Sequence, residues 1–128
     1  MGSRQQKTAI ERAIFQEAHL SRAMLGAGTT SIRLSSSGDP GRMYEAFYGL
    51  AHGVERIGKL ILVADHYART GVFMAPGEVE RYRHDLKRLL RAVEDVATTR
   101  GVPLDDSPSS NPGSKAVVRF LTKFAETD

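Results

Sequence analysis

The sequence contains no cysteine and no tryptophan, and only 7% of its residues are aromatic. Without cysteine the chain can form no disulfide, no thiolate metal site and no cysteine nucleophile, which fits a reducing compartment. Its longest strongly apolar run, 60–64, is far shorter than the roughly 20 residues of a membrane-spanning helix. No charged-then-apolar leader opens the chain. These absences favour a cytoplasmic domain with no membrane segment.

Phosphate-loop and nucleophile-elbow motifs are also lacking, so nucleotide hydrolysis and hydrolase triads have no sequence support. Hydrophobic residues make up 41% of the 128 residues and charged residues 26%, with a net charge of +3, as in ordinary globular proteins. This length fits roughly one domain of the usual 100–200 residues. We therefore expect a single domain over residues 1–128.

Apolar residues recur at helical spacing, and no strand-like alternation occurs, which predicts an all-α bundle of about four helices. The expected helices run from about Gln5 to Leu25, from Asp39 or Pro40 to about Thr70, from Pro76 to about Thr99, and around Val117 to Phe124. Segments 26–41 and 101–114 are rich in turn-forming residues and are predicted to be flexible loops. No helix stop signal precedes Asp128, which indicates fraying or a native chain that continues.

The second predicted helix is the most apolar element. One continuous face contains Met43, Phe47, Leu50, Val54, Ile57, Ile61, Ala64 and Ala68. Gly49 and Gly53 lie one turn apart and would allow another helix to approach closely. Tyr48, His52, Glu55, Lys59 and His66 fall on the opposite, polar side.

Four basic side chains share one side of the third predicted helix, opposite its apolar stripe: Arg81, His84, Arg88 and Arg91. Such a ridge could pair with the phosphates of a nucleic acid or face solvent, balanced by neighbouring carboxylates. Asp65 falls on the buried side of the second helix and needs a partner, such as an arginine of another helix. His52 and His66 lie about 21 Å apart along their helix and cannot share a metal ion. We expect no metal and no cofactor.

Two segments resemble the HEPN-like superfamily of prokaryotic helical domains. They are the glycine-bearing helix around Glu55-Arg56-x-x-Lys59 and the downstream His84-Asp85-Leu86. The resemblance covers about Met43 to Phe124. It implies a bundle of four or more helices, homodimerisation, and a group that includes RNases of toxin–antitoxin and antiphage systems together with inactive RNA-binding members.

HEPN RNases carry an Arg-x(4–6)-His motif. Only Arg12-x6-His19 fits that spacing here, on the first helix and outside the expected place. Carried over by position, the resemblance implies His84 and Arg56 as a catalytic pair and Lys59 as an RNA contact beside Arg81, Arg88 and Arg91. Glu55 and Asp85, like Asp65, are then structural polar residues that pair with neighbouring cations.

Three functions follow from these patterns. The first is an RNA-binding or protein-interaction module in a bacterial defence or toxin–antitoxin system, with RNA, a second copy or an antitoxin-like protein as partner. The second is a metal-independent endoribonuclease that uses His84 or His19 with an arginine. The third is a structural oligomerisation domain that buries the Gly49/Gly53 face against a partner helix.

Overall fold

The computed structural model describes residues 4–35, 39–104 and 111–126. Within these ranges the chain is all-α, as predicted, with no strand, and it forms five helices rather than four. They are α1 (Arg4–Leu34), α2 (Pro40–Thr70), α3 (Pro76–Glu80), α4 (Leu86–Thr99) and α5 (Pro112–Glu126). No helix in the described part of the chain combines the length and hydropathy needed to cross a membrane.

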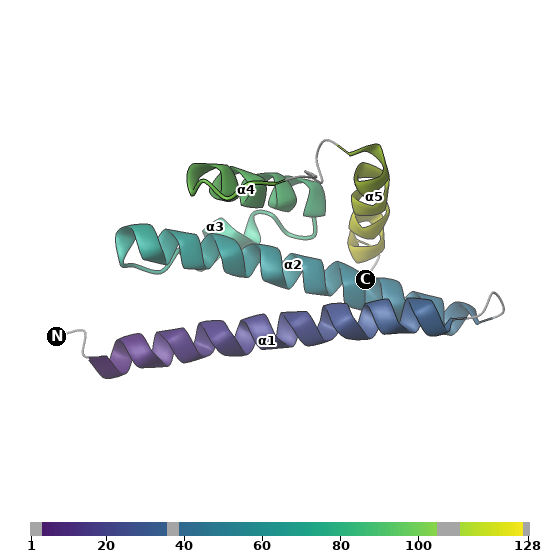
Figure 1. The fold of residues 1–128 in the computed structure, drawn as a ribbon, viewed down its shortest axis with the longest axis horizontal. Coiled ribbons are helices and arrows are strands. Elements are labelled where there is room, and N and C mark those ends of the chain that lie inside the picture. Colours follow the sequence, from purple (N-terminus) through teal and green to yellow (C-terminus); the bar gives the residue numbers. More distant parts are fainter. Residues whose placement is uncertain (1–3, 36–38, 105–110, 127–128) are drawn as a thin grey trace.

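The two long helices α1 and α2, each of 31 residues, form an antiparallel hairpin (Figure 1). Helix α2 is the central element: α1 packs on one side of it, and α3, α4 and α5 lie on the other. Among the described residues, α1 contacts no helix except α2. The molecule is therefore an open stack of layers in which α2 alone connects the two outer layers.

Helix α2 begins and ends as expected. The Asp39 side chain accepts a hydrogen bond from the backbone N–H of Arg42, and Pro40 opens the first turn. At the other end Gly71 takes a left-handed conformation with φ 75°, which ends the helix. Short polar and flexible residues thus fix both ends of the most apolar helix.

The prediction that residues 26–41 form a loop is wrong for most of its length, because α1 continues to Leu34. Residues 36–38 lie outside the described part of the chain. Thr29 stays helical with its hydroxyl bonded back to the carbonyl of Leu25 at 2.8 Å. Arg42 of α2 also donates to the Leu34 carbonyl at 3.3 Å, which satisfies one backbone acceptor at the end of α1.

Gly28, one of the glycines that suggested a loop, is instead a site of helix contact, as Gly53 of α2 is. A Cβ on Gly28 would lie 3.0 Å from the carbonyl oxygen of Ala46, and one on Gly53 would lie 2.8 Å from side-chain carbons of Leu25. Close packing against α2 thus compensates for the weak helix propensity of glycine. Since α1 of the same chain covers Gly49 and Gly53, this face is not available to a partner helix, contrary to the third sequence hypothesis.

The third predicted helix is broken into α3 and α4. Arg83 adopts φ 45°, which is unfavourable for a residue with a side chain and interrupts the helix. The N–H of Asp85 bonds to the Tyr82 carbonyl at 2.9 Å, and the Asp85 side chain caps α4 through the Arg88 N–H at 3.2 Å. Apolar residues keep helical spacing across the break, so periodicity alone could not locate it.

The fully buried core joins α2, α4 and α5. Its buried members include Ala51, Leu62, Leu86, Leu89 and Leu121. At one end of α2, the Phe47 ring contacts Phe120 and Phe124 at centroid distances of 4.9 and 5.9 Å. These contacts dock α5 across α2 (Figure 1).

The connection between α4 and α5 is shorter than the predicted loop 101–114. Residues 101–104 are non-helical, 105–110 lie outside the described residues, and α5 already begins at Pro112. The Asn111 side chain accepts hydrogen bonds from the N–H groups of Gly113 and Ser114 at 2.9 and 3.1 Å. Asn111 therefore caps α5 and adds a first turn that the apolar spacing did not predict.

Candidate functional site

Glu55 is a buried carboxylate, only 6% exposed, although the helical phase placed it on the polar side of α2. Lys59 Nζ donates to its Oε1 at 2.8 Å, and His84 Nδ1 lies 3.0 Å from the same oxygen. His52 Nδ1 lies 3.7 Å from Oε2. A buried carboxylate needs such partners because an unpaired charge is costly to remove from water. The helix around Glu55 and Lys59 and the segment His84–Asp85 thus meet at Glu55.

His84 reaches Glu55 from the short link between α3 and α4, not from a helix. The left-handed residue Arg83 immediately precedes it, and Asp85 immediately follows as the cap of α4. Strained backbone of this kind costs on the order of 1 kcal/mol and persists where surrounding contacts hold it. The contact of His84 with Glu55 and the cap at Asp85 provide that support.

The predicted basic ridge is not a single helix face. Arg81 lies at the end of α3, and its guanidinium carbon is 5.1 Å from the centre of the Tyr82 ring. Arg88 belongs to α4 and lies 5.6 Å from the same ring centre. Both arginines therefore flank Tyr82 in cation–π geometry, while His84 turns toward Glu55. Arg91, by contrast, lines a cleft between α4 and α5.

Arg56 and His84, the implied catalytic pair, have different partners. Arg56 Nε and Nη2 donate to the two carboxylate oxygens of Glu17 on α1 at 2.7 and 2.8 Å, and this hydrogen bonding raises the arginine's pKa. Within the described residues no hydrogen bond or ion pair joins Arg56 to His84. Arg56 connects α2 to α1, whereas His84 connects the α3–α4 link to α2.

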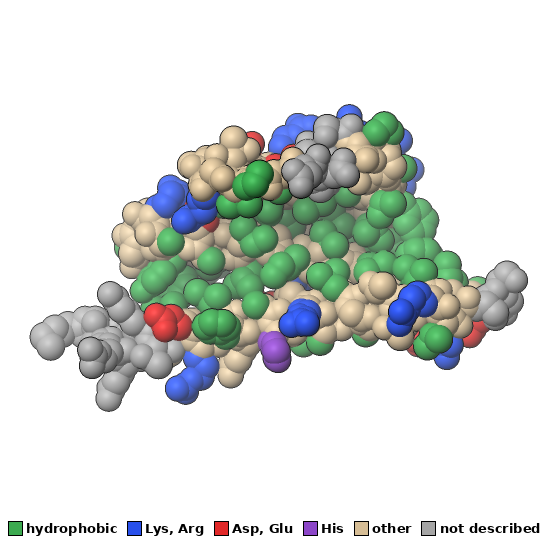
Figure 2. All heavy atoms as spheres, viewed as in Figure 1, with side chains coloured by type: hydrophobic (Ala, Val, Ile, Leu, Met, Phe, Trp, Pro, Cys, Tyr) green, Lys and Arg blue, Asp and Glu red, His purple; other side chains and the backbone are tan. Residues whose placement is uncertain are grey.

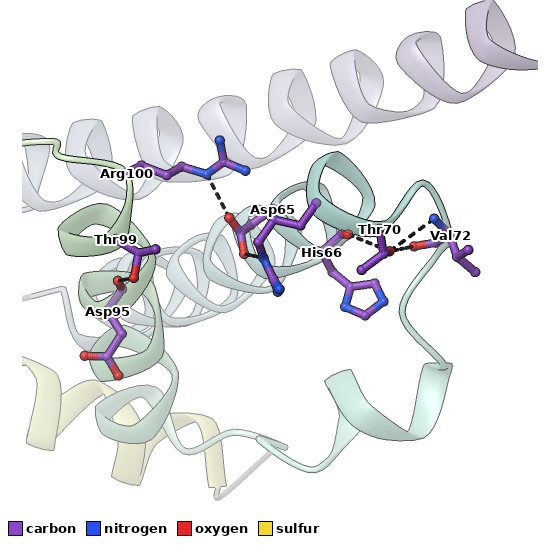
Figure 3. Close-up of polar contacts among 8 residues, drawn as sticks. Asp65, His66, Thr70, Val72, Asp95, Thr99 and Arg100 are labelled. Carbon is purple, nitrogen blue, oxygen red and sulfur yellow. Dashed lines mark hydrogen bonds and ion pairs between the residues drawn. The ribbon is translucent and has the colours of Figure 1, made fainter.

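Asp65 holds the far end of α2 to α4 (Figure 3). Arg69 Nε donates to its Oδ2 at 2.9 Å, and Arg100, the residue after α4, donates through Nε to Oδ1 at 2.7 Å. The Asp65 side chain is 11% exposed, whereas the two arginines are about half exposed. Hydrogen bonds first from Arg69 and then from Arg100 lower the pKa of Asp65. Arg100, which follows α4, is thus the partner of Asp65 from outside α2.

A cleft of about 410 Å³ opens between α4 and α5. Five cationic side chains and two carboxylates line it, together with Leu90, Val118 and Thr122. The cations are Lys87 and Arg91 on α4 and Lys115, Arg119 and Lys123 on α5; the carboxylates are Asp85 and Glu126. Lys and Arg side chains gather at this edge of the molecule, at the top of Figure 2.

Sequence reasoning found Arg91 and Asp85 but missed the other charged residues of this cleft. A signal was present, because Lys115, Arg119 and Lys123 are spaced by four residues and share one face of a helix. Their partners on α4 could not be inferred, since only the tertiary packing brings the two helices together. None of the five cations forms an ion pair with another described residue, whereas the Asp85 carboxylate accepts from the Arg88 N–H.

The described residues contain no group of three or more histidine or acidic side chains arranged to hold a metal ion. The chain matches no known protein family, and neither curated proteins nor solved structures give a match. The candidate site therefore rests on its own geometry. It consists of two parts. The first is the buried Glu55 carboxylate with its partners near the start of α4, and the second is the basic cleft between α4 and α5, whose cations form no ion pair with a described residue.

We expect Asp65→Asn to lower the free energy of unfolding by about 1 kcal/mol near neutral pH, because the arginines lose a charged acceptor. The carboxyl has a lower pKa in the folded protein than its usual value of about 3.9 in the unfolded chain. Its contribution is therefore present above about pH 4 and is lost as the pH falls through the lowered value. Urea unfolding of both proteins across this range measures the effect.

Asp95→Asn is the matched control, since Asp95 is exposed and its side chain makes no ion pair with a described residue. It should leave stability nearly unchanged at every pH. A difference between wild type and Asp65→Asn that stays constant from neutral to strongly acidic pH would contradict the assignment.

Proposed function

We propose that this chain is an RNA-binding helical module of the HEPN-like type, and that its α4–α5 cleft binds the RNA phosphates. The observation that carries the proposal is the set of five cationic side chains around one cleft, none paired with a carboxylate of the described residues. Five cations against two carboxylates leave the lining with an excess of three positive charges, equal to the net charge of the whole chain.

This arrangement suits a phosphate backbone better than a single small anion. Two helices supply the cations, so the charge extends along both walls of the cleft and can meet successive phosphates. Arg91 and Arg119 add guanidinium groups, which donate two hydrogen bonds to one phosphate. When these cations neutralise RNA phosphates, the counterions condensed on the RNA are released. This release supplies affinity without sequence preference.

Binding without cleavage is the function that these contacts favour. The endoribonuclease hypothesis pairs His84 with Arg56, but Arg56 is held by Glu17 on α1. The alternative pair Arg12 and His19 lies on exposed positions of α1, away from the basic cleft. Arg12 and His19 can therefore be substituted without changing the cleft.

Arg91→Gln should weaken the binding of a short single-stranded RNA and reduce the salt dependence of its affinity. Loss of one phosphate contact lowers the slope of log K against log salt by about 0.7. Fluorescence anisotropy of a labelled oligonucleotide, measured at several salt concentrations in EDTA, gives both quantities. Arg12→Gln, which removes an exposed arginine of α1, is the matched control and should change neither.

Equal effects of Arg91→Gln and Arg12→Gln would contradict the assignment of the cleft. The same samples report on catalysis, because the RNA should be recovered intact after incubation in EDTA. Cleavage that disappears in His84→Ala would instead establish the endoribonuclease.

Self-association is a second candidate function, and the exposed surface of the chain favours it. The chain exposes 8838 Å² at a mass of 14.0 kDa, whereas a compact monomer of this mass exposes about 6,700 Å². The excess of about 2,100 Å² exceeds the roughly 800 Å² that each partner buries in a standard interface. The open stack therefore has enough spare surface for a second copy.

The apolar side of α2 is where a second copy would dock. Hydrophobic side chains are exposed in a band between α1 and the layer of α4 and α5 (Figure 2). Ile57 lines a shallow hollow of about 580 Å³ between α1 and α2, bordered by Arg22 and Arg33. The face expected to be buried is thus only partly covered by the chain's own helices. A homodimer that covers it, as the HEPN resemblance implies, would complete the core.

Analytical ultracentrifugation should give twice the chain mass of 14.0 kDa for the wild type and the monomer mass for Ile57→Glu. A carboxylate at Ile57 would have to leave water and enter the apolar contact of the dimer, which is costly even when charges of opposite sign lie nearby. Val117→Glu, on an exposed position of α5, is the control and should remain dimeric. A wild-type protein that stays monomeric at high concentration would refute this second function.

A further inference from the structure

The α4–α5 cleft has a feature that phosphate binding does not use, namely an apolar floor. Leu90 of α4 and Val118 of α5 are half-buried and line the cleft beneath the cationic side chains. Phosphates of a double helix would meet only the charged rim, because the bases of a duplex are paired and stacked inside it. A floor of this kind is suited to a ligand that carries an apolar, flat group next to its phosphates.

The size of the cleft sets the scale of that group. A volume of about 410 Å³ lies in the range of pockets that enclose small ligands, roughly 300–1,000 Å³. A cleft of this volume cannot enclose a helical duplex, whose major groove alone is about 12 Å wide. One nucleotide, with its base inward and its phosphates outward, is a ligand of suitable dimensions.

The walls supply groups that recognise a base. Arg91 on α4 and Arg119 on α5 face the cleft from opposite helices, and planar guanidinium groups stack on unpaired bases. Thr122 also lines the cleft, and its hydroxyl is buried and has no hydrogen-bond partner among the described residues. A buried hydroxyl without a partner is unfavourable, and the polar edge of a base can satisfy it.

We propose that the α4–α5 cleft is a pocket for one unpaired nucleotide of single-stranded RNA. The base lies on Leu90 and Val118 and bonds to Thr122, and the flanking phosphates contact the lysines and arginines of the rim. This inference rests on the proposed RNA-binding function and specifies its substrate class. It makes the protein selective for single strands, whereas the cationic rim alone would bind single and double strands alike.

Three ligands of equal length test the pocket on the wild-type protein: a single-stranded RNA, the same strand annealed to its complement, and a strand that lacks bases. Burial of one base against a protein surface is worth roughly a 5- to 150-fold change in affinity. The single strand should therefore bind at least about fivefold more tightly than the duplex and the abasic strand. Anisotropy at one fixed salt concentration measures all three.

Val118→Phe fills the floor of the pocket and should lower the affinity for the single strand at least about fivefold while leaving duplex affinity unchanged. Val117→Phe places the same substitution on the adjacent exposed position and is the matched control. Thr122→Val keeps the shape of the side chain and removes only its hydroxyl. Thr122→Val is the test variant if Val118→Phe fails to fold. It should weaken binding of the single strand but not of the duplex.

The possible results distinguish failure of the nucleotide pocket from failure of the proposed RNA-binding function. Salt-sensitive binding with equal affinity for single strand, duplex and abasic strand would overturn the pocket and leave the proposed RNA-binding function standing. A loss of affinity that Val118→Phe or Thr122→Val shows equally for single strand and duplex would also overturn it. If none of the three ligands binds in a salt-sensitive manner, the proposed function and the pocket both fail.

Discussion

The carboxylate of Glu55 is placed inside the helical stack, and the position of the α3–α4 link depends on how its charge is compensated. Lys59 and His84 share one of its oxygens, and His52 lies beside the other. A buried carboxylate that lost these partners would be strongly destabilising, so the link is held where His84 can reach α2. Because Asp85 follows His84 directly and caps α4, the same contact fixes where α4 starts. The cleft between α4 and α5 depends on that position.

Helix α2 serves two layers by different means. On the α1 side its small residues allow close backbone approach, with Ala46 fully buried and Gly53 in contact range of Leu25. On the α4 and α5 side, leucine and phenylalanine side chains fill the core, and Asp65 adds a polar tie to Arg100. One apolar side of α2 stays open between these layers (Figure 2). Interior packing, the basic α4–α5 cleft and the open apolar side of α2 thus occupy different faces of a small set of helices.

Local patterns were sufficient to predict the all-α class and both ends of α2, because Asp39, Pro40 and Gly71 are strong local signals. That Asp65 needs a partner also followed from its phase on α2, but periodicity could not identify Arg69 and Arg100 as the donors. The extension of α1 through Gly26 and Gly28 did not, since it depends on the packing of α2 against the Gly28 region of α1, which the local sequence does not show. The break at Arg83 was hidden by uninterrupted apolar spacing. The basic cleft was missed because its cations lie on two helices whose relative position is set by tertiary contacts.

The most direct test of this account is amide hydrogen exchange of α4 in Glu55→Gln, with Glu45→Gln at an exposed position of α2 as the control. Glutamine has nearly the shape of glutamate but lacks the charge that binds Lys59 and His84, so the start of α4 should loosen. We expect faster exchange of the amides of Leu86–Thr99 in Glu55→Gln and little change in α1. In Glu45→Gln, exchange should match the wild type throughout the chain. Unchanged protection of α4 in Glu55→Gln would show that the Glu55 cluster does not hold α4 in place, and would contradict the account.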